Sequence, residues 1–392
     1  MTGLIGRFPV GGNTWAYLQY VLGLKRLGFD VYYLEDSTDL LCYNPELNVT
    51  DTECGSCVDY LRNVMNSVGM TNKWIYRVED KCYGLSRNDF VDLCKDSELF
   101  FNISGSTLLK FWLPREEYKS LRNKIYVDTD PAFTQFRIAN EKKLRPTILS
   151  KQPWKFIINS VEEHDVLFTF GENIGEPDCQ VPDCNLKWYK TRQPILLDMW
   201  PPKIDTTLEP FTTVMNWKAY NPITYNNETY GQKDIEFLKF IDLPNFTNQR
   251  IELAMSGGVR PKILLDHGWS LVSGIAKERR DMWSYQRYIQ QSRAEWSIAK
   301  NIYVKTWCGW FSERSACYLA SAKPTLLQDT GFSKCLPTGR GLIPFRDMEG
   351  LLKGIDRINS NYLMHCEAAR QITEEYFASD KVLKDILRKM GF

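Results

Sequence analysis

The sequence contains no long apolar run. No stretch approaches the roughly 18 to 20 apolar residues of a membrane-spanning helix. The amino terminus also shows no basic start followed by an apolar segment and a small-residue cleavage site. An internal repeat and a low-complexity tract are missing as well. These absences predict a globular protein that stays in the cytoplasm.

A regular cysteine framework is also missing. The eleven cysteines are odd in number and spread over the whole length, which favours reduced thiols over a set of disulfides. Cys54 with Cys57, and Cys179 with Cys184, resemble zinc half-sites, but neither pair has a second pair of ligands nearby. Buried or surface thiols are therefore expected, with structural zinc as the alternative.

What the chain does have is length. Its 392 residues, 43% hydrophobic and 25% charged, exceed one ordinary domain and predict two domains of about 200 residues. The opening residues read as a short strand (4–8), a glycine loop (9–12), a helix (13–29) with a possible cap at Asn13, and a strand (30–36). This order is the first unit of a doubly wound parallel sheet.

Strand-like runs alternate with helical ones in both halves of the chain. Between the halves, residues 200–210 contain three prolines and short polar residues, which predicts a linker. Residues 362–389 read as one amphipathic helix. The pattern predicts an α/β protein with two Rossmann-like, doubly wound domains that face a central cleft. The later strands are expected at 98–104, 124–130, 165–171, 211–217, 251–258, 269–274, 295–300, 324–329 and 341–345.

One helix of the second half has the features of a phosphate site. It starts at Ser312, with Glu313 and Arg314 in its first turn. Its unpaired backbone N–H groups and the positive end of its dipole then point toward the cleft, as in sites for a diphosphate. Arg314 can add a bidentate contact, and Ser312 can cap the helix or bind an oxygen.

The strand that follows delivers Asp329, Thr330 and Gly331 to the same edge. Asp329 can accept hydrogen bonds from sugar hydroxyls, and Gly331 lets the backbone approach a ligand closely. Lys300, at the end of an earlier strand, is a further candidate for the diphosphate. Each feature also has a plain structural reading, as a cap, a turn or an exposed strand end. The spacing of one helix and one strand between 312 and 329 favours a binding site.

The formal net charge of +1 hides an asymmetry. Residues 1–104 carry 9 Lys/Arg against 14 Asp/Glu, whereas residues 105–160 carry 11 against 5. The basic stretch is interleaved with aromatic residues, which together can bind a polyanion and stack on its bases. A solvated helical face with core aromatics is the more ordinary interpretation. The aromatic residues of the stretch are Phe111, Trp112, Tyr118, Tyr126, Phe133, Phe136, Trp154 and Phe156.

Six segments together resemble two-domain glycosyltransferases of the GT-B fold, in particular a bacterial and phage group with little functional description. The resemblance implies an acceptor domain (1–200), a linker (201–210), a domain for a nucleotide sugar (211–372), and a last helix (373–392) that crosses back to the first domain. It also implies that no metal is required. The matching segments are 11–36, 127–135, 168–175, 211–217, 292–300 and 309–339.

The sequence departs from this group in one respect. Retaining members often have two glutamates eight positions apart around the phosphate helix. Counted from Glu313, the second position is Ser321, and if the helix is aligned on its small residues it is Cys317. The stereochemistry of the reaction therefore stays open.

The resemblance and the strand ends together assign candidate roles. A base for an acceptor hydroxyl is expected at Asp128, Asp130 or Glu172, since they follow strands of the first domain. The histidines are not favoured as the base. Acceptor contacts are expected from Gly11, Gly12, Asn13 and Asn173, and donor contacts from Asn216, Arg260, Lys300, Ser312, Glu313, Arg314, Asp329, Thr330 and Gly331.

The predicted function is transfer of a hexose from a nucleotide sugar, a uridine diphosphate hexose on family grounds, to an acceptor hydroxyl. No other cofactor is expected. The basic aromatic stretch weakly favours a hydroxymethylated pyrimidine in phage DNA as acceptor, which would place the enzyme in the host cytoplasm. A small metabolite, lipid or glycan is the main competing acceptor. A nucleotide-sugar epimerase and an inert nucleotide-sugar-binding protein are the alternative functions.

Overall fold

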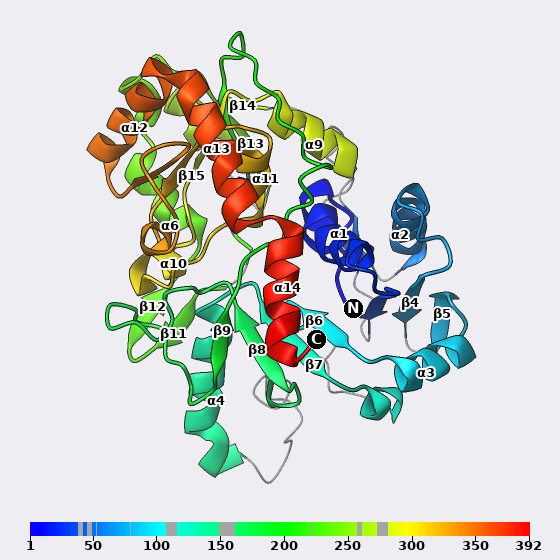
Figure 1. Ribbon diagram of the computed structural model, residues 1–392. Coiled ribbons are helices and arrows are strands. Elements are labelled where there is room, and N and C mark those ends of the chain that lie inside the picture. Colours follow the sequence, from blue (N-terminus) through cyan, green and yellow to red (C-terminus); the bar gives the residue numbers. More distant parts are fainter. Residues whose placement is uncertain are drawn as a thin grey trace.

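The computed structural model describes residues 1–37, 42–44, 49–51, 53–78, 80–106, 116–148, 161–219, 221–256, 261–272 and 281–392. Two α/β halves are stacked in Figure 1, with the amino-terminal half below and the carboxyl-terminal half above. Three prolines and several short polar residues separate the halves, and no helix or strand forms between Trp200 and Pro210. The mixed α/β class agrees with the sequence prediction.

In the described part of the first half, the amino terminus joins seven strands, six of them parallel, into one layer. The backbone of Thr2 donates to Phe101 O (2.8 Å), and Gly3 donates to Leu34 O (3.2 Å), so residues 1–3 lie between two strand groups. One group has the order β1 (Tyr33–Ser37), β4 (Trp74–Val78), β5 (Lys81–Gly84), where β5 is antiparallel. The other is β6 (Phe100–Ile103), β7 (Lys124–Asp128), β8 (Val166–Thr169), β9 (Trp188–Lys190).

The predicted first strand at residues 4–8 is wrong by a few positions. Residues 1–3 take the strand position, and residues 5–7 form a turn. The reason is a side chain: the Glu35 carboxylate accepts hydrogen bonds from the backbone of Gly6 (2.9 Å) and Arg7 (2.6 Å). These N–H groups are therefore paired with a buried carboxylate instead of a neighbouring strand.

The second half contains a six-stranded parallel sheet. Its first strand in the chain lies near the middle and later strands extend both edges, which is the doubly wound arrangement. The buried strands are short and mostly apolar, as expected where helices cover both faces of a sheet. Every strand predicted for this half is present. The order across the sheet is β14 (Ser270–Leu271), β13 (Ile251–Ser256), β10 (Phe211–Asn216), β15 (Ala294–Ser297), β16 (Thr325–Gln328), β17 (Leu342–Phe345).

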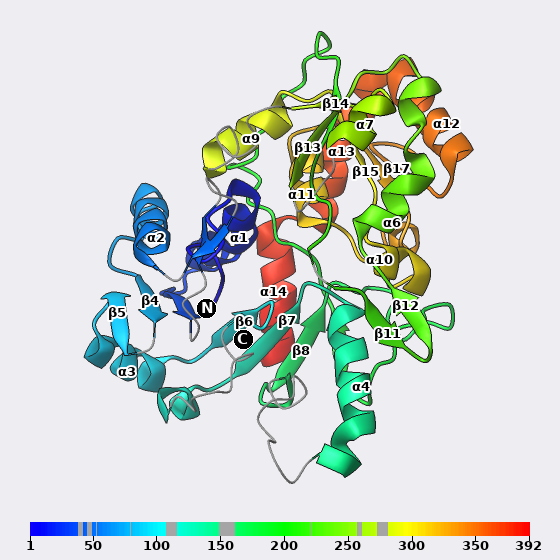
Figure 2. The same cartoon turned by 180° about the vertical axis from the view of Figure 1, so that it is seen from behind.

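Two antiparallel hairpins stand apart from the sheets. One pairs β2 (Cys42–Asn44) with β3 (Val49–Asp51), and the other pairs β11 (Ile223–Tyr225) with β12 (Glu228–Tyr230). The β11–β12 hairpin belongs to the second half but lies against α4 (Phe133–Ile148) of the first half in both Figures 1 and 2. It is therefore one of the connections that set the two halves relative to each other.

The helices cover the sheets and form the contacts between the halves. In the first half they are α1 (Gly11–Arg26), α2 (Gly55–Ser67), α3 (Arg87–Asp96), the 3-10 helix η1 (Glu116–Ser120) and α4. In the second half they are α6 (Lys233–Phe237), η3 (Leu238–Phe240), η4 (Leu243–Asn245), α7 (Pro261–Asp266), α9 (Met282–Gln290), α10 (Asn301–Thr306), α11 (Glu313–Ala320), η5 (Phe332–Lys334), α12 (Met348–Ser360), α13 (Tyr362–Tyr376) and α14 (Ser379–Met390).

The single helix predicted for 362–389 is two helices. The chain breaks between α13 and α14, where Ile195 donates its N–H to Phe377 O (2.7 Å) and accepts from Ser379 N–H (2.9 Å). These bonds replace the helical ones at that point. The break turns α14 onto α1 of the first half, where a Cβ added at Gly23 would lie 2.5 Å from Leu383 Cδ1.

Lys323, directly before β16, is a buried lysine without a partner. Its side chain is 0% exposed, and its Nζ makes no hydrogen bond to any part of the chain that the structure describes. Burial lowers the pKa of Lys323 to about 8, because a low-dielectric environment disfavours the ammonium form. The unfolded chain, with a lysine pKa of roughly 10.4, binds this proton more strongly, so the penalty is fully present below pH 8 and disappears as the pH rises through 10.

We therefore expect Lys323→Met to stabilise the protein. Methionine fills a similar volume without a charge, and the melting temperature should rise by roughly 2 °C or more at pH 7. The gain should shrink between pH 8 and pH 10 in thermal melts followed by circular dichroism. A lower melting temperature at pH 7 would show instead that the ammonium has a partner that stabilises it.

Candidate active site

The carboxyl ends of β15 and β16 and the start of α11 surround a small pocket lined by both apolar and polar residues. The helix begins directly after Ser312, as predicted, and Ser312 has extended backbone angles typical of a cap. Its side chain makes no capping hydrogen bond. The Ser312 hydroxyl and the first N–H groups of α11 are therefore not hydrogen-bonded to each other. The pocket is lined by Ser297, Ile298, Ala299, Trp310, Phe311, Ser312, Arg314, Ser315, Leu327, Gln328, Thr330 and Phe332.

Arg314 faces the sheet beneath this pocket. Its Nε donates to Glu295 Oε1 (2.6 Å), one terminal nitrogen donates to Val214 O (2.6 Å), and the other donates to Ser297 Oγ (2.7 Å). Burial alone would lower the pKa of Arg314. The neighbouring Glu295 carboxylate outweighs this effect, so the pKa is raised above its usual value and the guanidinium stays charged. Three of its five N–H groups are thus occupied. The predicted bidentate phosphate contact is limited to the two that remain.

Two buried polar atoms at the same place have no partner. Ser315 Oγ and Glu295 Oε2 are fully buried and make no hydrogen bond within the described residues. Ser315 lines the pocket, and Glu295 lies behind Arg314. Buried polar atoms normally find a partner. Ser315 Oγ is therefore available to hydrogen-bond a ligand in this pocket.

Lys233, in the first turn of α6, is the residue that sequence analysis missed. It is 6% exposed and makes no hydrogen bond or ion pair with the described part of the chain. Burial lowers its pKa well below the usual value, and the nearby Arg314 guanidinium lowers it further, while Glu295 and Glu313 act in the opposite direction. The available signal was a lysine at a helix start, where the positive end of the dipole disfavours a cation.

The loop after β16 is held by its own side chains. The Asp329 carboxylate accepts from Gly331 N–H (3.0 Å) and from Ser333 Oγ (2.7 Å) and pairs with Arg346 (3.2 Å). Thr330 donates its hydroxyl to Trp310 O (2.6 Å). Gly331 has a φ of 99°, a left-handed conformation that glycine adopts without strain. These contacts are those of a turn that its own side chains stabilise. Of the predicted donor ligands Asp329, Thr330 and Gly331, Thr330 alone lines the pocket.

Asp130 and Lys300 meet across the two halves. Lys300 Nζ lies 2.6 Å from Asp130 Oδ1, and the Tyr303 hydroxyl donates to the same oxygen. The Asp130 side chain is 34% exposed, and that of Lys300 is 14% exposed. A candidate base of the first half and a candidate donor ligand of the second half are therefore in direct contact. The neighbouring Trp310 Nε1 donates to Thr129 O (3.1 Å) and closes the same gap.

Asp128 does not reach the cleft, in contrast to Asp130. It is 1% exposed, and its oxygens accept hydrogen bonds from Thr134 (2.7 Å), Gln135 (2.8 Å) and Thr169 (3.0 Å). Burial raises the pKa of Asp128 to about 6, against the effect of these hydrogen bonds. Two of the donors are side chains of the first turn of α4, so Asp128 holds the start of that helix through side-chain hydrogen bonds and not as a backbone cap.

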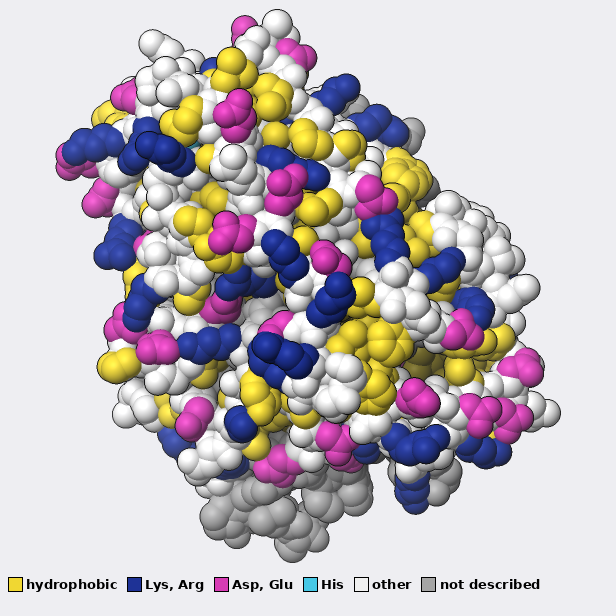
Figure 3. All heavy atoms as spheres, in the orientation of Figure 1, with side chains coloured by type: hydrophobic (Ala, Val, Ile, Leu, Met, Phe, Trp, Pro, Cys, Tyr) yellow, Lys and Arg dark blue, Asp and Glu magenta, His cyan; other side chains and the backbone are white. Residues whose placement is uncertain are grey.

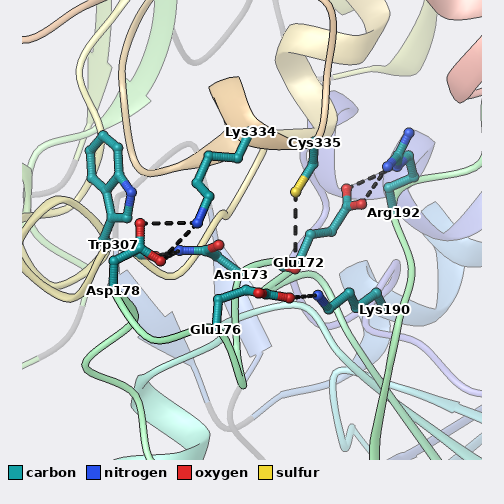
Figure 4. A network of polar contacts seen from close by, with 9 residues as sticks. All are labelled: Glu172, Asn173, Glu176, Asp178, Lys190, Arg192, Trp307, Lys334 and Cys335. Carbon is teal, nitrogen blue, oxygen red and sulfur yellow. Dashed lines mark hydrogen bonds and ion pairs between the residues drawn. The ribbon is translucent and has the colours of Figure 1, made fainter.

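Glu172 also points away from the cleft. Figure 4 shows its carboxylate facing Arg192, whose Nε lies 2.9 Å from Glu172 Oε1 in a two-bond pair. Burial raises the pKa of Glu172, and Arg192 partly offsets the effect. The expected catalytic contact therefore finds no support here. This carboxylate braces the segment after β8.

Asn173 connects the two halves instead of lining the acceptor side. Its Nδ2 donates to Trp307 O (2.8 Å) and to Asp178 Oδ1 (3.2 Å). Asp178 in turn pairs with Lys334 of the second half at 2.8 Å (Figure 4). This network holds residues 171–178 against the loops at 307 and 334.

The start of α1 lies against α9 of the second half. The helix begins at Gly11 with Val10 as its cap, so the predicted cap at Asn13 is wrong: the Asn13 amide instead donates to Leu4 O (2.7 Å) and Phe8 O (3.0 Å). A Cβ at Gly12 would lie 3.1 Å from the Tyr285 ring. Gly12 thus permits close contact between the halves beside the cleft.

Two predicted donor ligands complete the set. Asn216 is exposed at the carboxyl end of β10. Arg260 lies outside the described residues. Within the described part of the chain, no group of three or more His, Cys, Asp or Glu side chains is placed to hold a metal ion. No helix in that part is long and apolar enough to cross a membrane.

The basic aromatic stretch does not form one surface where it is described. Tyr118, Tyr126, Phe133 and Phe136 are buried core residues, so they are not available as stacking platforms. Phe111, Trp112, Trp154 and Phe156 lie outside the described residues. On the face shown in Figure 3, basic and acidic side chains are intermingled among the described residues. The core interpretation holds for these four aromatic residues.

Comparison with known proteins shows the fold. No protein-family model matches the chain, and no curated protein matches its sequence. Among the similar solved structures, three illustrate a likeness over nearly the full length. An alpha-glucosyltransferase in complex with UDP and a 13-mer DNA covers 100% of this chain and 98% of its own, with 10% identity and a TM-score of 0.57. Sucrose-phosphate synthase from Thermosynechococcus elongatus covers 99% and 98%, with 11% identity and a TM-score of 0.56.

The third is a glycosyltransferase from Rickettsia africae, which covers 100% of this chain and 96% of its own, with 10% identity and a TM-score of 0.50. At such identities the likeness establishes architecture and not activity. The chain has the GT-B fold, with two Rossmann-like domains that face each other. The fold predicted from the sequence is therefore confirmed.

Proposed function

We propose that the protein is a glycosyltransferase that moves a hexose from a uridine diphosphate sugar to an acceptor hydroxyl. The observation that carries this proposal is Lys233, which is buried without a hydrogen bond or ion pair among the described residues and interacts electrostatically with Arg314 and with Glu313 at the start of α11. A lysine buried without a partner is costly. It becomes favourable when an anion binds there, and a diphosphate matches both the charge and the helix amides.

The proposed donor site needs no metal to hold the leaving group. Lys233, the free N–H groups of Arg314 and the first-turn amides of α11 supply positive charge where the diphosphate charge develops. The Ser312 and Ser315 hydroxyls lie in the same pocket and can each donate one hydrogen bond. The chain itself thus provides the stabilisation that a bound cation would otherwise give.

Asp130 is the proposed base. During transfer, the acceptor oxygen forms a bond to the sugar carbon, the bond from that carbon to the diphosphate oxygen breaks, and the acceptor proton passes to a carboxylate. Asp130 is the partly exposed candidate at the cleft, and Lys300 contacts it directly. Once Asp130 has taken up the proton, its attraction for the Lys300 ammonium is weaker, and Lys300 can contact the departing diphosphate instead.

The pocket at α11 must open to admit the donor. It encloses about 20 Å³ in this structure, which is room for one water molecule. Trp310 lines the pocket and donates to Thr129 O of the first half, and the Lys300–Asp130 pair also joins the two halves. A nucleotide sugar would therefore separate these groups as it binds, which is an ordinary step in enzymes that close over a substrate.

A hydroxymethylated pyrimidine in DNA is the first acceptor that we propose to test. One structural neighbour is an alpha-glucosyltransferase in complex with UDP and DNA that contains an HMU base, and it supports this choice by its fold. The buried aromatic residues of the stretch 105–160 do not add support. A phosphorylated sugar, a lipid and a neutral glycan are the competing acceptors.

The test is a transfer assay with UDP-glucose and separate acceptor pools. We expect sugar transfer to at least one pool, with turnover retained in the presence of EDTA. The pools are hydroxymethylated DNA, unmodified DNA, hexose phosphates and neutral alcohols. Isomerisation of the free donor would identify an epimerase, and UDP binding without any product would identify an inert binding protein. Failure to bind UDP at all would contradict the proposed site.

A further inference from the structure

A wide groove lies between the two halves, outside the pocket at α11. Its volume is about 720 Å³, within the roughly 300 to 1,000 Å³ of sites that bind small molecules. One wall is the start of α4 in the first half. The other is the segment before the β11–β12 hairpin in the second half. The groove is lined by Phe133, Arg137, Lys218, Ala219, Asn221, Pro222 and Ile223.

The groove adjoins the proposed catalytic pair through Phe133. Lys300 Nζ lies 5.2 Å from the centre of the Phe133 ring, and Lys300 is the residue that contacts Asp130. The ring also meets Tyr303 edge to face at 6.1 Å. A ligand in the groove would therefore extend toward Asp130 from the side of the first half.

Contacts of the hairpin hold the two walls in place. Asn140 Nδ2 of α4 donates to Thr224 O (2.9 Å), and Lys143 Nζ donates to Asn226 Oδ1 (2.8 Å). Beside them, the rings of Phe136 and Tyr225 stack at 4.5 Å. The hairpin lies along α4 in both cartoon views (Figures 1 and 2). The groove is thus bounded by fixed elements from both halves.

The charge of the groove is one-sided. Arg137 and Lys218 are exposed at its rim and make no hydrogen bond or ion pair with the described residues. Its lining includes these two cations and no carboxylate. Phe133, Pro222 and Ile223 give it apolar walls, and Asn221 adds an amide. This chemistry suits a ligand that carries phosphate next to a less polar ring.

We propose that this groove binds the phosphate-bearing part of the acceptor. The inference rests on the proposed transferase function and deepens it, because it assigns the acceptor to an anionic class and gives it a direction of entry. The phosphate would lie between Arg137 and Lys218, and the acceptor hydroxyl would point past Phe133 toward Asp130. Such a phosphate comes either from a nucleic acid backbone or from a phosphorylated sugar.

The experiment measures binding of named probes without relying on turnover. A 13-mer DNA with a hydroxymethylated base and fructose 6-phosphate represent the two phosphate sources, and fructose is the neutral control. We expect one phosphate-bearing probe to bind at least ten times more tightly than fructose in calorimetric titrations. The double variant Arg137→Ala/Lys218→Ala should weaken that binding at least tenfold, whereas Arg137→Lys should retain part of it.

A matched control and a second titration make the result decisive. Arg122→Ala removes an exposed base of the same stretch, away from the groove, where Arg122 donates to Lys95 O, and it should leave probe binding unchanged. UDP titrations separate this inference from the proposed function. If the unaltered protein does not bind UDP, the proposed donor site is contradicted, but the groove assignment is not. The groove assignment is overturned if neither phosphate-bearing probe binds, if the double variant binds them normally, or if its UDP affinity falls by the same factor.

Discussion

Replacing Lys233 with methionine is expected to raise the melting temperature of the protein while it weakens UDP binding about 10- to 100-fold. The two effects have one physical cause. In the free protein the ammonium is buried without a partner, so its removal relieves a desolvation penalty. In the complex the same ammonium forms a charge-assisted hydrogen bond of about 1.5–3 kcal/mol with the diphosphate. Thermal melts with and without UDP, together with calorimetric titration, measure both effects.

The pH dependence gives an independent check on Lys233. Its folded-state pKa is lowered, so the unfolded chain binds the proton more strongly and the penalty is complete only below the folded pKa. A bound diphosphate favours the protonated form. UDP binding above that pKa should therefore take up a proton, and its affinity should fall as the pH rises toward 10. Neither trend should remain in Lys233→Met.

Lys323→Met is the matched control for this prediction. Both lysines are buried and lack a partner among the described residues, but only Lys233 interacts electrostatically with Arg314 and Glu313 at the start of α11. Its replacement should raise the melting temperature and leave UDP affinity unchanged. If Lys233→Met instead lowers the melting temperature and keeps normal UDP affinity, Lys233 is a structural residue and the proposed donor site loses its main support.

The architecture was predictable because its signals are local. Apolar runs such as 325–328 and 342–345, separated by helical spacing, are sufficient to indicate a parallel sheet. The errors arose where a distant partner decides the local conformation. Glu35 turns residues 5–7 away from a strand, and Ile195 breaks the last helix at Phe377. Both partners are more than 25 positions away, so no local pattern contains them.

The sequence predicted the helix start and the strand ends at the candidate site, but not the contacts that its side chains make. The start of α11 and the contact between Asp130 and Lys300 follow from strand ends that share one edge. Asp128, Glu172 and Asp329 lie near the cleft as well, but each carboxylate is occupied by donors that sequence spacing does not reveal. Lys233 was missed because the β11–β12 hairpin separates it from β10 along the chain, and only the fold brings it within electrostatic range of Arg314.

The second large effect is expected at Arg314. Its guanidinium joins α11 to β10 and β15 through Glu295, Val214 O and Ser297. Arg314→Met should cost about 3–5 kcal/mol of unfolding free energy, because it leaves the Glu295 carboxylate buried without its counter-ion. Denaturant titration against the unaltered protein measures this loss.

A double-mutant cycle separates the structural role of Arg314 from its role in binding. The variant Arg314→Met/Glu295→Leu removes both charges and should recover most of the lost stability, because a buried ion pair is often replaceable by apolar side chains of similar volume. The double variant is then folded and can be titrated with UDP. If the two N–H groups of Arg314 that have no partner in this structure contact the diphosphate, its UDP affinity should be about tenfold lower. Unchanged affinity would show that Arg314 only stabilises the packing of α11 on the sheet. The diphosphate would then be bound by Lys233 and the α11 amides alone.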